Sequence, residues 1–191
     1  MIDVPFKDAD IERAVADSKR CGTLKDSVTQ GAGQTAGLLA EIAIGNFLGA
    51  KRPPPGEYDP NFDLRLHGVR VEVKTKRRTV DPRPDYNGTV PDRQMGRQLA
   101  DWYAFASIRF GKVEGDHPKV YTHPKRITLC GFITPEDFKN RSIYFVKGSG
   151  DGGNGFAAHR SCWSIEYSQL TTLDQWSHLV KNAGPSAMSQ A

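Results

Sequence analysis

The stretch of sequence that decides the fold is FDLRLHGVRVEVKTK, residues 62–76. Apolar and polar residues alternate on both sides of His67 and Gly68, and this is the period of a β-strand, whose successive side chains point to opposite faces. A two-residue loop with glycine in second place suits a tight turn that needs positive φ. The stretch therefore predicts a β-hairpin with its turn at His67 and Gly68.

The position of the turn fixes the register of this hairpin. Counting back from the turn places Asp63 directly opposite Glu72, so that two carboxylates are cross-strand partners. The apolar side chains share one face: Leu64, Leu66, Val69, Val71 and Val73. The charged side chains share the other face: Asp63, Arg65, Arg70, Glu72 and Lys74. We expect the first face to build a core and the second to build a site.

The opposed acids call for a neutralising cation. Cross-strand partners hold their Cβ atoms roughly 4.5–5.5 Å apart, a distance at which the charges of Asp63 and Glu72 repel. A divalent metal would neutralise them, because hard cations such as Mg²⁺ take carboxylate, water and phosphate oxygens as ligands. Lys74, on the same face, could meet a water nucleophile or a phosphate. The alternative is a solvated face on which Arg65, Arg70 and Lys74 balance the two acids.

The strongest helical pattern precedes the hairpin, at residues 34–48, QTAGLLAEIAIGNFL. Its apolar residues recur at helical spacing, and Gly49 is a suitable terminator. Glu41 is the only formally charged residue of this stretch and lies next to Ile42, in the sector expected to be buried. An ionised carboxylate there is costly unless it is paired, hydrogen-bonded or bound to a metal. The alternative places Glu41 on a narrow solvent-facing stripe.

Length and composition agree with one folded domain over residues 1–182, followed by a disordered tail at 183–191. The 191 residues are enough for a sizeable core, and 38% hydrophobic with 25% charged residues is usual for folded proteins. A net charge of +4 and a pI near 9.0 are compatible with a polyanionic partner. No apolar run approaches 18 residues and no signal peptide is recognisable, so neither membrane spanning nor secretion is predicted.

Several motifs carry no catalytic prediction. The cysteines Cys21, Cys130 and Cys162 are odd in number and widely spaced, which favours inert core thiols in a reducing, cytoplasmic setting. His117 and His123 lack further zinc ligands nearby. The glycine-rich run 148–155 lacks the Lys-Ser/Thr ending of a phosphate-binding loop, and we expect a flexible loop there.

The remaining elements follow from periodicity and from helix caps. Residues 51–59 form a proline-stiffened connection, and residues 77–91 form a basic, turn-rich loop that either contacts phosphate or is merely solvated. Thr134, followed by proline and two acids, is typical of a helix N-terminus. Further helices are expected at 8–19, 92–99 and 173–180, and strands at 102–110, 127–133 and 161–167.

The order of these elements, with a long apolar helix before the charged hairpin, resembles the core of the PD-(D/E)XK nuclease superfamily. The matching residues are Phe62-Asp63 for the first acid and Glu72-Val73-Lys74 for the E-x-K element. Glu41 is similar to the additional acid found on the preceding helix in many members. The resemblance covers about residues 34–133 and departs from the pattern where Phe62, and not proline, precedes the first acid.

This resemblance implies an α/β (α+β mixed) fold with a restriction-endonuclease-like core, a central mixed β-sheet flanked by helices. Residues 134–182 would be a C-terminal extension, similar to that of small phage-type members. Mg²⁺ or Mn²⁺ would be bound by Asp63, Glu72, the Val73 carbonyl and Glu41. Lys74 would position or help deprotonate the attacking water. Asp63, Glu72, Lys74 and Glu41 would thus form the catalytic set, with the metal lowering the pKa of its bound water.

Basic residues around the hairpin fit contact with a nucleic-acid backbone. Arg65 and Arg70 share the site face, and Lys76, Arg77 and Arg78 continue from the strand end into the next loop. Phosphate contacts there would make binding salt-sensitive. The expected partner is DNA, in the cytoplasm, or in the host cytoplasm for a phage protein. RNA in place of DNA, endo- or exonuclease action, substrate structure and a homodimer all stay open.

The predicted function is therefore metal-dependent hydrolysis of DNA phosphodiester bonds, of a kind that would suit a phage or a mobile element. One alternative is a catalytically inactive nucleic-acid-binding relative of the same fold. A retaining glycosidase would also use two carboxylates about 5 Å apart. The neighbouring lysine and arginines argue against it, because they are expected to hold both acids ionised instead of raising the pKa of one.

Overall fold

A computed structural model describes residues 1–21, 33–52, 59, 61–96, 99–111, 123–150 and 158–182. Most of the predicted proline-stiffened connection, the larger part of the glycine-rich loop, His117 and the tail 183–191 lie outside the described residues. No helix in the described part of the chain is both long and apolar enough to span a membrane.

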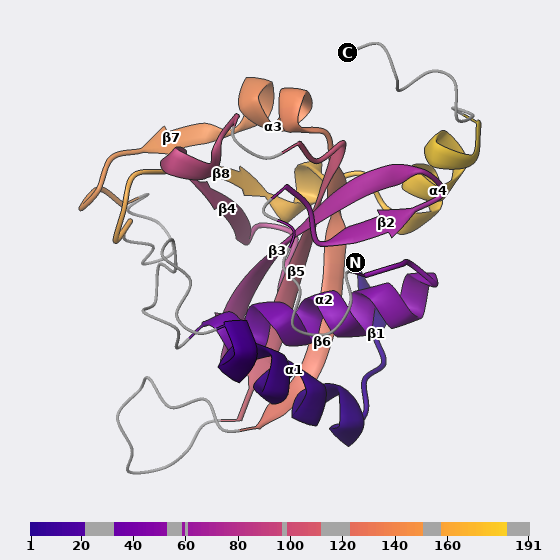
Figure 1. Ribbon diagram of the computed structural model, residues 1–191. Coiled ribbons are helices and arrows are strands. Elements are labelled where there is room, and N and C mark those ends of the chain that lie inside the picture. Colours follow the sequence, from indigo (N-terminus) through magenta and orange to yellow (C-terminus); the bar gives the residue numbers. More distant parts are fainter. Residues whose placement is uncertain are drawn as a thin grey trace.

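Five strands form the main sheet, in the order β1–β6–β5–β3–β2 (Figure 1). Strands β3 and β5 run parallel, whereas the other neighbouring pairs are antiparallel. The strands are β1 (Ile2–Val4), β2 (Leu64–Leu66), β3 (Val69–Arg78), β5 (Trp102–Phe110) and β6 (Pro124–Ile133). With the helices described below, this sheet confirms the prediction of a mixed α/β fold with a mixed central sheet.

The hairpin of β2 and β3 has the predicted register. Leu64 pairs with Val71, and Leu66 pairs with Val69. At the turn, His67 has φ 49° and Gly68 has φ 87°, as a tight turn with positive φ requires. The predicted apolar face is buried in the main core, where it contributes Leu64, Leu66, Val69, Val71 and Val73.

Helices α1 (Asp8–Cys21) and α2 (Gln34–Leu48) pack against each other on one side of the main sheet (Figure 1). Helix α2 has the bounds that the sequence predicts, and it ends at Gly49 with φ 67°. It is apolar on nearly all sides because it lies between the sheet and α1. Its side chains join the apolar face of the hairpin in one core.

A second sheet covers the opposite face of β5. Its strands are β4 (Asn87–Pro91), β8 (Cys162–Glu166) and β7 (Ile143–Phe145), in that order and antiparallel. Helix α3 (Pro135–Arg141) begins at the predicted cap, where the Thr134 hydroxyl accepts the Asp137 N–H at 3.1 Å. Phe105 of β5 stacks on Phe138 of α3, with ring centroids 5.7 Å apart. The second core therefore connects this small sheet and α3 to β5.

Glycine at position 88 allows β4 to approach β5. A Cβ atom there would lie 2.3 Å from the Phe105 ring, which is closer than any real contact. On the other side of the main sheet, helix α4 (Leu173–Asn182) places Trp176 against Phe132, with ring centroids 4.1 Å apart.

Some sequence predictions need correction. Strands β1, β4 and β7 were not predicted, and β4 lies within the stretch 77–91 that was predicted to be a loop. Each has only three to five residues, so tertiary pairing with β6 or β8 forms it, not local periodicity. The helix predicted at 92–99 is a single 3-10 turn, η1 (Asp92–Gln94). A second such turn, η2 (Tyr167–Gln169), follows β8.

The cysteines agree with inert thiols. Cys130 and Cys162 are buried, whereas Cys21 is half-buried at the end of α1. Burial raises the pKa of Cys130 to about 12, and it also raises the pKa of Cys21 and of Cys162. Since the thiolate is the nucleophile, these thiols are poorly reactive.

Candidate active site

Asp63 lies just before β2 and is held against β3 by two hydrogen bonds. Its backbone N–H donates to the Val71 carbonyl at 3.0 Å, and its carboxylate oxygen Oδ2 accepts the Val73 N–H at 2.7 Å. The ladder ends at the pair Leu64–Val71, so Asp63 and Glu72 are not a regular cross-strand pair. Instead, the two hydrogen bonds of Asp63 reach Val71 and Val73, the residues on either side of Glu72, and they hold Asp63 beside Glu72.

The backbone of Val73 also belongs to this site. In a strand, the N–H and the C=O of one residue point to the same side. Because the Val73 N–H reaches Asp63, its carbonyl points to the same edge of β3, the edge along which Asp63 lies. The Asp63 carboxylate therefore lies at the Val73 backbone, and metal binding by the Val73 carbonyl stays a prediction.

Glu72 and Lys74 project from β3 to the side opposite its apolar residues. Their side chains are only 10% and 9% exposed, and the Lys74 Nζ donates to Glu72 Oε1 at 2.9 Å. The same Nζ donates to Gln94 Oε1, in η1, at 3.0 Å. It also lies 5.7 Å from the centre of the Tyr103 ring. Lys74 is therefore held in one place by groups from β3, η1 and β5.

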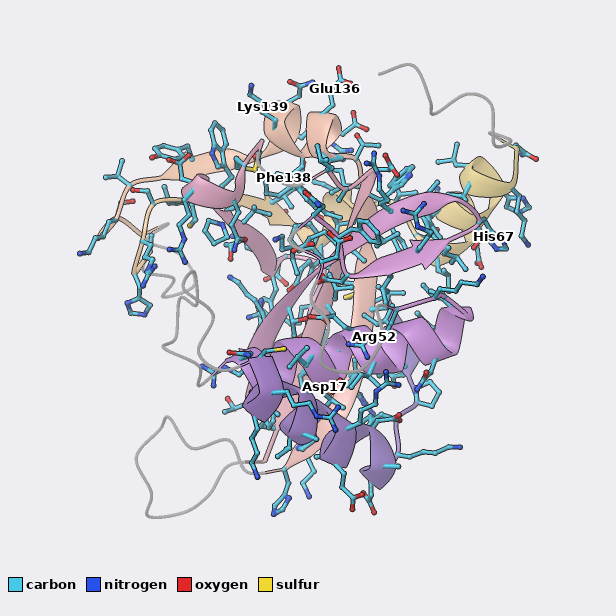
Figure 2. All side chains as sticks on the ribbon, in the orientation of Figure 1. Asp17, Arg52, His67, Glu136, Phe138 and Lys139 are labelled. Atoms are coloured by element: carbon cyan, nitrogen blue, oxygen red, sulfur yellow. The ribbon has the colours of Figure 1, made fainter. Side chains whose placement is uncertain are left out.

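Glu41 comes from α2 and is largely buried, with 17% of its side chain exposed. Its oxygen Oε2 accepts a hydrogen bond from Arg52 Nη2 at 3.3 Å, and the Arg52 side chain is 11% exposed. Figure 2 shows Arg52 lying against α2. Glu41 is thus paired inside the protein and does not lie on a solvent-facing stripe.

Two of the three acids, Glu41 and Asp63, have a raised pKa. Burial raises the pKa of Glu41 to about 7, and the charge of Glu72 adds to this effect, against Arg52 and Lys74. Burial also raises the pKa of Asp63 well above its usual range, and the charges of Glu41 and Glu72 act in the same direction. The Val73 N–H and Lys74 only partly oppose this rise. Arg52 and Lys74 therefore do not fully compensate the acids.

This finding corrects one step of the sequence argument. The neighbouring cations were expected to hold both hairpin acids ionised, but burial and the other carboxylates outweigh Lys74 at Asp63. The charge argument against a glycosidase is therefore weaker than the sequence indicates. Several cations nevertheless follow the acids along β3: Lys74, Lys76, Arg77 and Arg78.

The donor set fits a hard divalent cation that keeps several water ligands. Asp63 lies just before β2, whereas Glu72 and Val73 lie on β3, and within the described residues Asp63 has no ion pair that would compensate its charge. Within the described residues, no three His, Cys, Asp or Glu side chains are grouped so that they could hold a metal ion. A site of this kind suits Mg²⁺, which is commonly bound by one or two carboxylates, waters and substrate phosphates.

The predicted phosphate-binding residues differ in their surroundings. Arg70 pairs with Asp101 through two side-chain hydrogen bonds of 2.7 and 3.1 Å. Arg65 is exposed and lies over the Phe62 ring, 5.0 Å from its centre. The other three follow Lys74 along β3 and are half-buried: Lys76, Arg77 and Arg78.

Arg78 has partners within the second core. Its guanidinium donates to the Asn87 carbonyl at 3.1 Å and lies 4.6 Å from the centre of the Tyr86 ring. Together with the Arg70 pair, this contact shows that two of the five predicted basic residues help to hold the fold. The sequence pattern could not distinguish them from the others, because their partners come from distant or irregular segments.

Sequence reasoning missed two residues of the site. Gln94 fell in a stretch predicted to be a helix, and nothing in its local sequence linked it to Lys74. Arg52 fell in the proline-stiffened connection. A signal for a partner did exist, since Glu41 in an apolar helix needs a compensating group, but the sequence could not identify which one.

No protein-family model matches this chain, and searches of curated proteins and of solved structures found no significant match. The site must therefore be interpreted from its own chemistry.

Proposed function

We propose that this protein is a metal-dependent nuclease that hydrolyses DNA phosphodiester bonds by a PD-(D/E)XK mechanism. The observation that carries the proposal is the arrangement around β3. Asp63 is bonded to the backbone of Val73, and Lys74 contacts Glu72 at 2.9 Å. Glu41 from α2 is close enough for its charge to raise the pKa of Asp63. Acids that repel one another beside a fixed lysine are typical of a functional site.

Asp63, Glu72 and the Val73 carbonyl are the groups that would hold Mg²⁺ or Mn²⁺. When bound, such a cation lowers the pKa of water and neutralises charge that develops on the phosphate. Glu41 would act through a water molecule, because Arg52 already occupies one of its oxygens.

Lys74 would act on the attacking water or on the scissile phosphate. Its Nζ is oriented by Glu72 and Gln94, so the ammonium group does not have to be ordered when the substrate binds. From this position it donates a hydrogen bond to the nucleophile or to a phosphate oxygen. Gln94 is then a positioning residue for Lys74.

The DNA backbone would run along the end of β3. Lys76 follows Lys74 on the same face of this strand, and Arg77 comes next, near its end, on the other face. Arg65 is exposed on the hairpin next to it. Contacts from such residues to phosphates are independent of base sequence. They weaken as the salt concentration rises, because the release of counterions from DNA then contributes less to binding. We therefore propose recognition of the backbone.

A nucleic-acid-binding relative without catalytic activity is the second candidate. It is favoured by the finding that the described residues contain no ready group of three metal-binding side chains. Its affinity for DNA would survive chelation of metal ions, and it would cleave nothing with any metal.

Cleavage assays distinguish the two candidates. The purified protein is incubated with linear duplex, single-stranded and branched DNA, in Mg²⁺, Mn²⁺ or EDTA. The Glu72→Ala variant tests the site, and Glu136→Ala, which removes an exposed acid on α3 (Figure 2), is the matched control. We expect metal-dependent cleavage that is lost in Glu72→Ala and kept in Glu136→Ala. Salt-sensitive binding without cleavage would instead favour the second candidate.

A further inference from the structure

Arg52 comes from the connection before the hairpin and pairs with Glu41, one of the three acids Glu41, Asp63 and Glu72 that we call the acid cluster. We propose that Arg52 is a positioning residue that occupies the Glu41 side of the cluster and restricts the site to one divalent metal ion. This inference rests on the proposed function, because it assumes that Asp63 and Glu72 bind a metal. The inference concerns the number of metal ions that the site binds, which the three acids alone would not determine.

The contact between Arg52 and Glu41 supports this role. The guanidinium Nη2 lies 3.3 Å from Glu41 Oε2, and both side chains are largely buried. A cation already placed on a buried carboxylate does what a second metal ion would do there, which is to neutralise its charge. A second metal that binds Glu41 through Oε2 would therefore have to displace the arginine.

The backbone around Arg52 keeps its side chain in this position. The preceding residue, Lys51, exchanges two hydrogen bonds with Arg65, of 2.9 and 2.8 Å. Arg52 is thus attached to the free edge of the hairpin. Its aliphatic part lies against Gly45 of α2, where an added Cβ would be 3.1 Å from the Arg52 Cδ. Glycine at position 45 therefore leaves room for this side chain between α2 and the hairpin.

The charge of the cluster leads to the same conclusion. With Glu41, Asp63 and Glu72 ionised, the fixed cations of Arg52 and Lys74 leave one negative charge uncompensated. One divalent cation is enough to neutralise it. A second one would add a large positive charge to a site with little solvent, where like charges repel strongly.

Metal stoichiometry measures this property without any cleavage assay. Isothermal titration calorimetry with Mn²⁺ is carried out on the full chain without DNA. We expect the wild-type protein to bind one Mn²⁺. Arg52→Met should bind a second Mn²⁺, because Glu41 loses its fixed cation. The double variant Arg52→Met with Glu41→Gln should return to one.

Two further variants complete the design. Arg160→Met removes an exposed arginine to which no role in metal or DNA binding is assigned, and it should leave the count at one. Circular dichroism verifies that each variant is folded. If Arg52→Met does not fold, Arg52→Gln replaces it, because glutamine keeps an N–H donor for Glu41 but lacks the charge.

The outcomes separate this inference from the proposed function. Two Mn²⁺ ions on the wild-type protein, or a single ion on the folded arginine variant, would overturn the role of Arg52 and leave the nuclease proposal intact. Absence of any bound Mn²⁺ on the wild-type protein would overturn the nuclease proposal and this inference with it.

Discussion

Two aspartates, Asp101 and Asp63, both accept hydrogen bonds from β3 but have opposite pKa shifts. Asp101 comes just before β5 and accepts three hydrogen bonds from Arg70, one of them from its backbone N–H at 2.7 Å. Burial by itself would raise the pKa of Asp101, but these bonds outweigh it and the pKa is lowered. Asp63 receives the Val73 N–H, and burial and two other acids raise its pKa.

The difference separates a structural ion pair from a candidate site. Asp101 has its own arginine, so its charge is compensated in the folded protein. Among the described residues Asp63 forms no ion pair, and it shares Lys74 with two further acids. The fold thus gives Asp101 an ion pair and gives Asp63 none among the described residues, and this contrast supports the proposed metal site. The following predictions test this contrast.

The largest effect is expected at the lysine of the site. Replacement of Lys74 by alanine should reduce Mg²⁺-dependent DNA cleavage by about 10²–10⁴-fold, the usual contribution of a positioned acid–base group. Arg70→Ala, on the same face of β3, should affect cleavage much less, because Arg70 is paired with Asp101. Single-turnover rates at saturating protein measure both. Equal losses of the cleavage rate in the two variants would contradict the catalytic role of Lys74.

The raised pKa of Glu41 should make the folded protein less stable as the pH rises. Its value rises from 4.5 to about 7 on folding, so the folded protein binds a proton more tightly than the unfolded chain. The resulting contribution is fully present below pH 4.5 and is lost as pH rises through 7, by roughly 3 kcal/mol at most. Urea unfolding at pH 5 and pH 8 measures it.

Two comparisons make this prediction specific. In Glu41→Gln the fall in stability between pH 5 and pH 8 should be smaller, because the amide does not titrate. Asp101 acts in the opposite direction, since its lowered pKa contributes stability above 3.8 that is lost as the solution becomes more acidic. A pH-independent stability in the wild-type protein would argue against the raised pKa.

Metal ions should stabilise the folded protein. A ligand at a hundred times its dissociation constant adds about 2.7 kcal/mol to the free energy of unfolding. We expect Mg²⁺ to raise the melting temperature and EDTA to reverse the rise. The rise should disappear in Glu72→Ala and persist in Asp101→Asn. A rise of the same size in both variants would show that the ions act elsewhere.

The smallest effect concerns the two aspartates themselves. Asp101→Asn should lower the free energy of unfolding by about 1–2 kcal/mol, a value reduced by the partial exposure of the Arg70 pair. Asp63→Asn should leave the stability unchanged or raise it, because a neutral amide relieves the repulsion by Glu41 and Glu72. Denaturant unfolding of both variants in the absence of metal measures these changes in the free energy of unfolding. A larger loss in the free energy of unfolding for Asp63→Asn than for Asp101→Asn would mean that the charge of Asp63 stabilises the folded protein.

Local patterns predicted much of the fold. The alternation around His67 and Gly68 gave the hairpin register, and the apolar period gave the bounds of α2. Both depend on near neighbours in the chain. The strands β1, β4 and β7 depend on partners far away in the sequence, and short segments of this kind have too few residues to show a period.

The same limit applies to the candidate site. Asp63, Glu72 and Lys74 could be proposed together because one hairpin holds them all. Gln94 and Arg52 reach the site from irregular segments, so their contacts appear only once the chain is folded. The displacement of Asp63 from the regular ladder was also hidden, because it depends on the bond from the Val73 N–H to its side chain.

The most direct test of the account compares Asp63→Asn with Asp101→Asn in Mg²⁺-dependent cleavage of DNA. Both changes remove one charge from an aspartate beside β3, and circular dichroism confirms that both variants are folded. The account predicts no cleavage above the EDTA background in Asp63→Asn and retained cleavage in Asp101→Asn. Equal cleavage by the two variants would contradict it, because the uncompensated acid would then have no part in the chemistry.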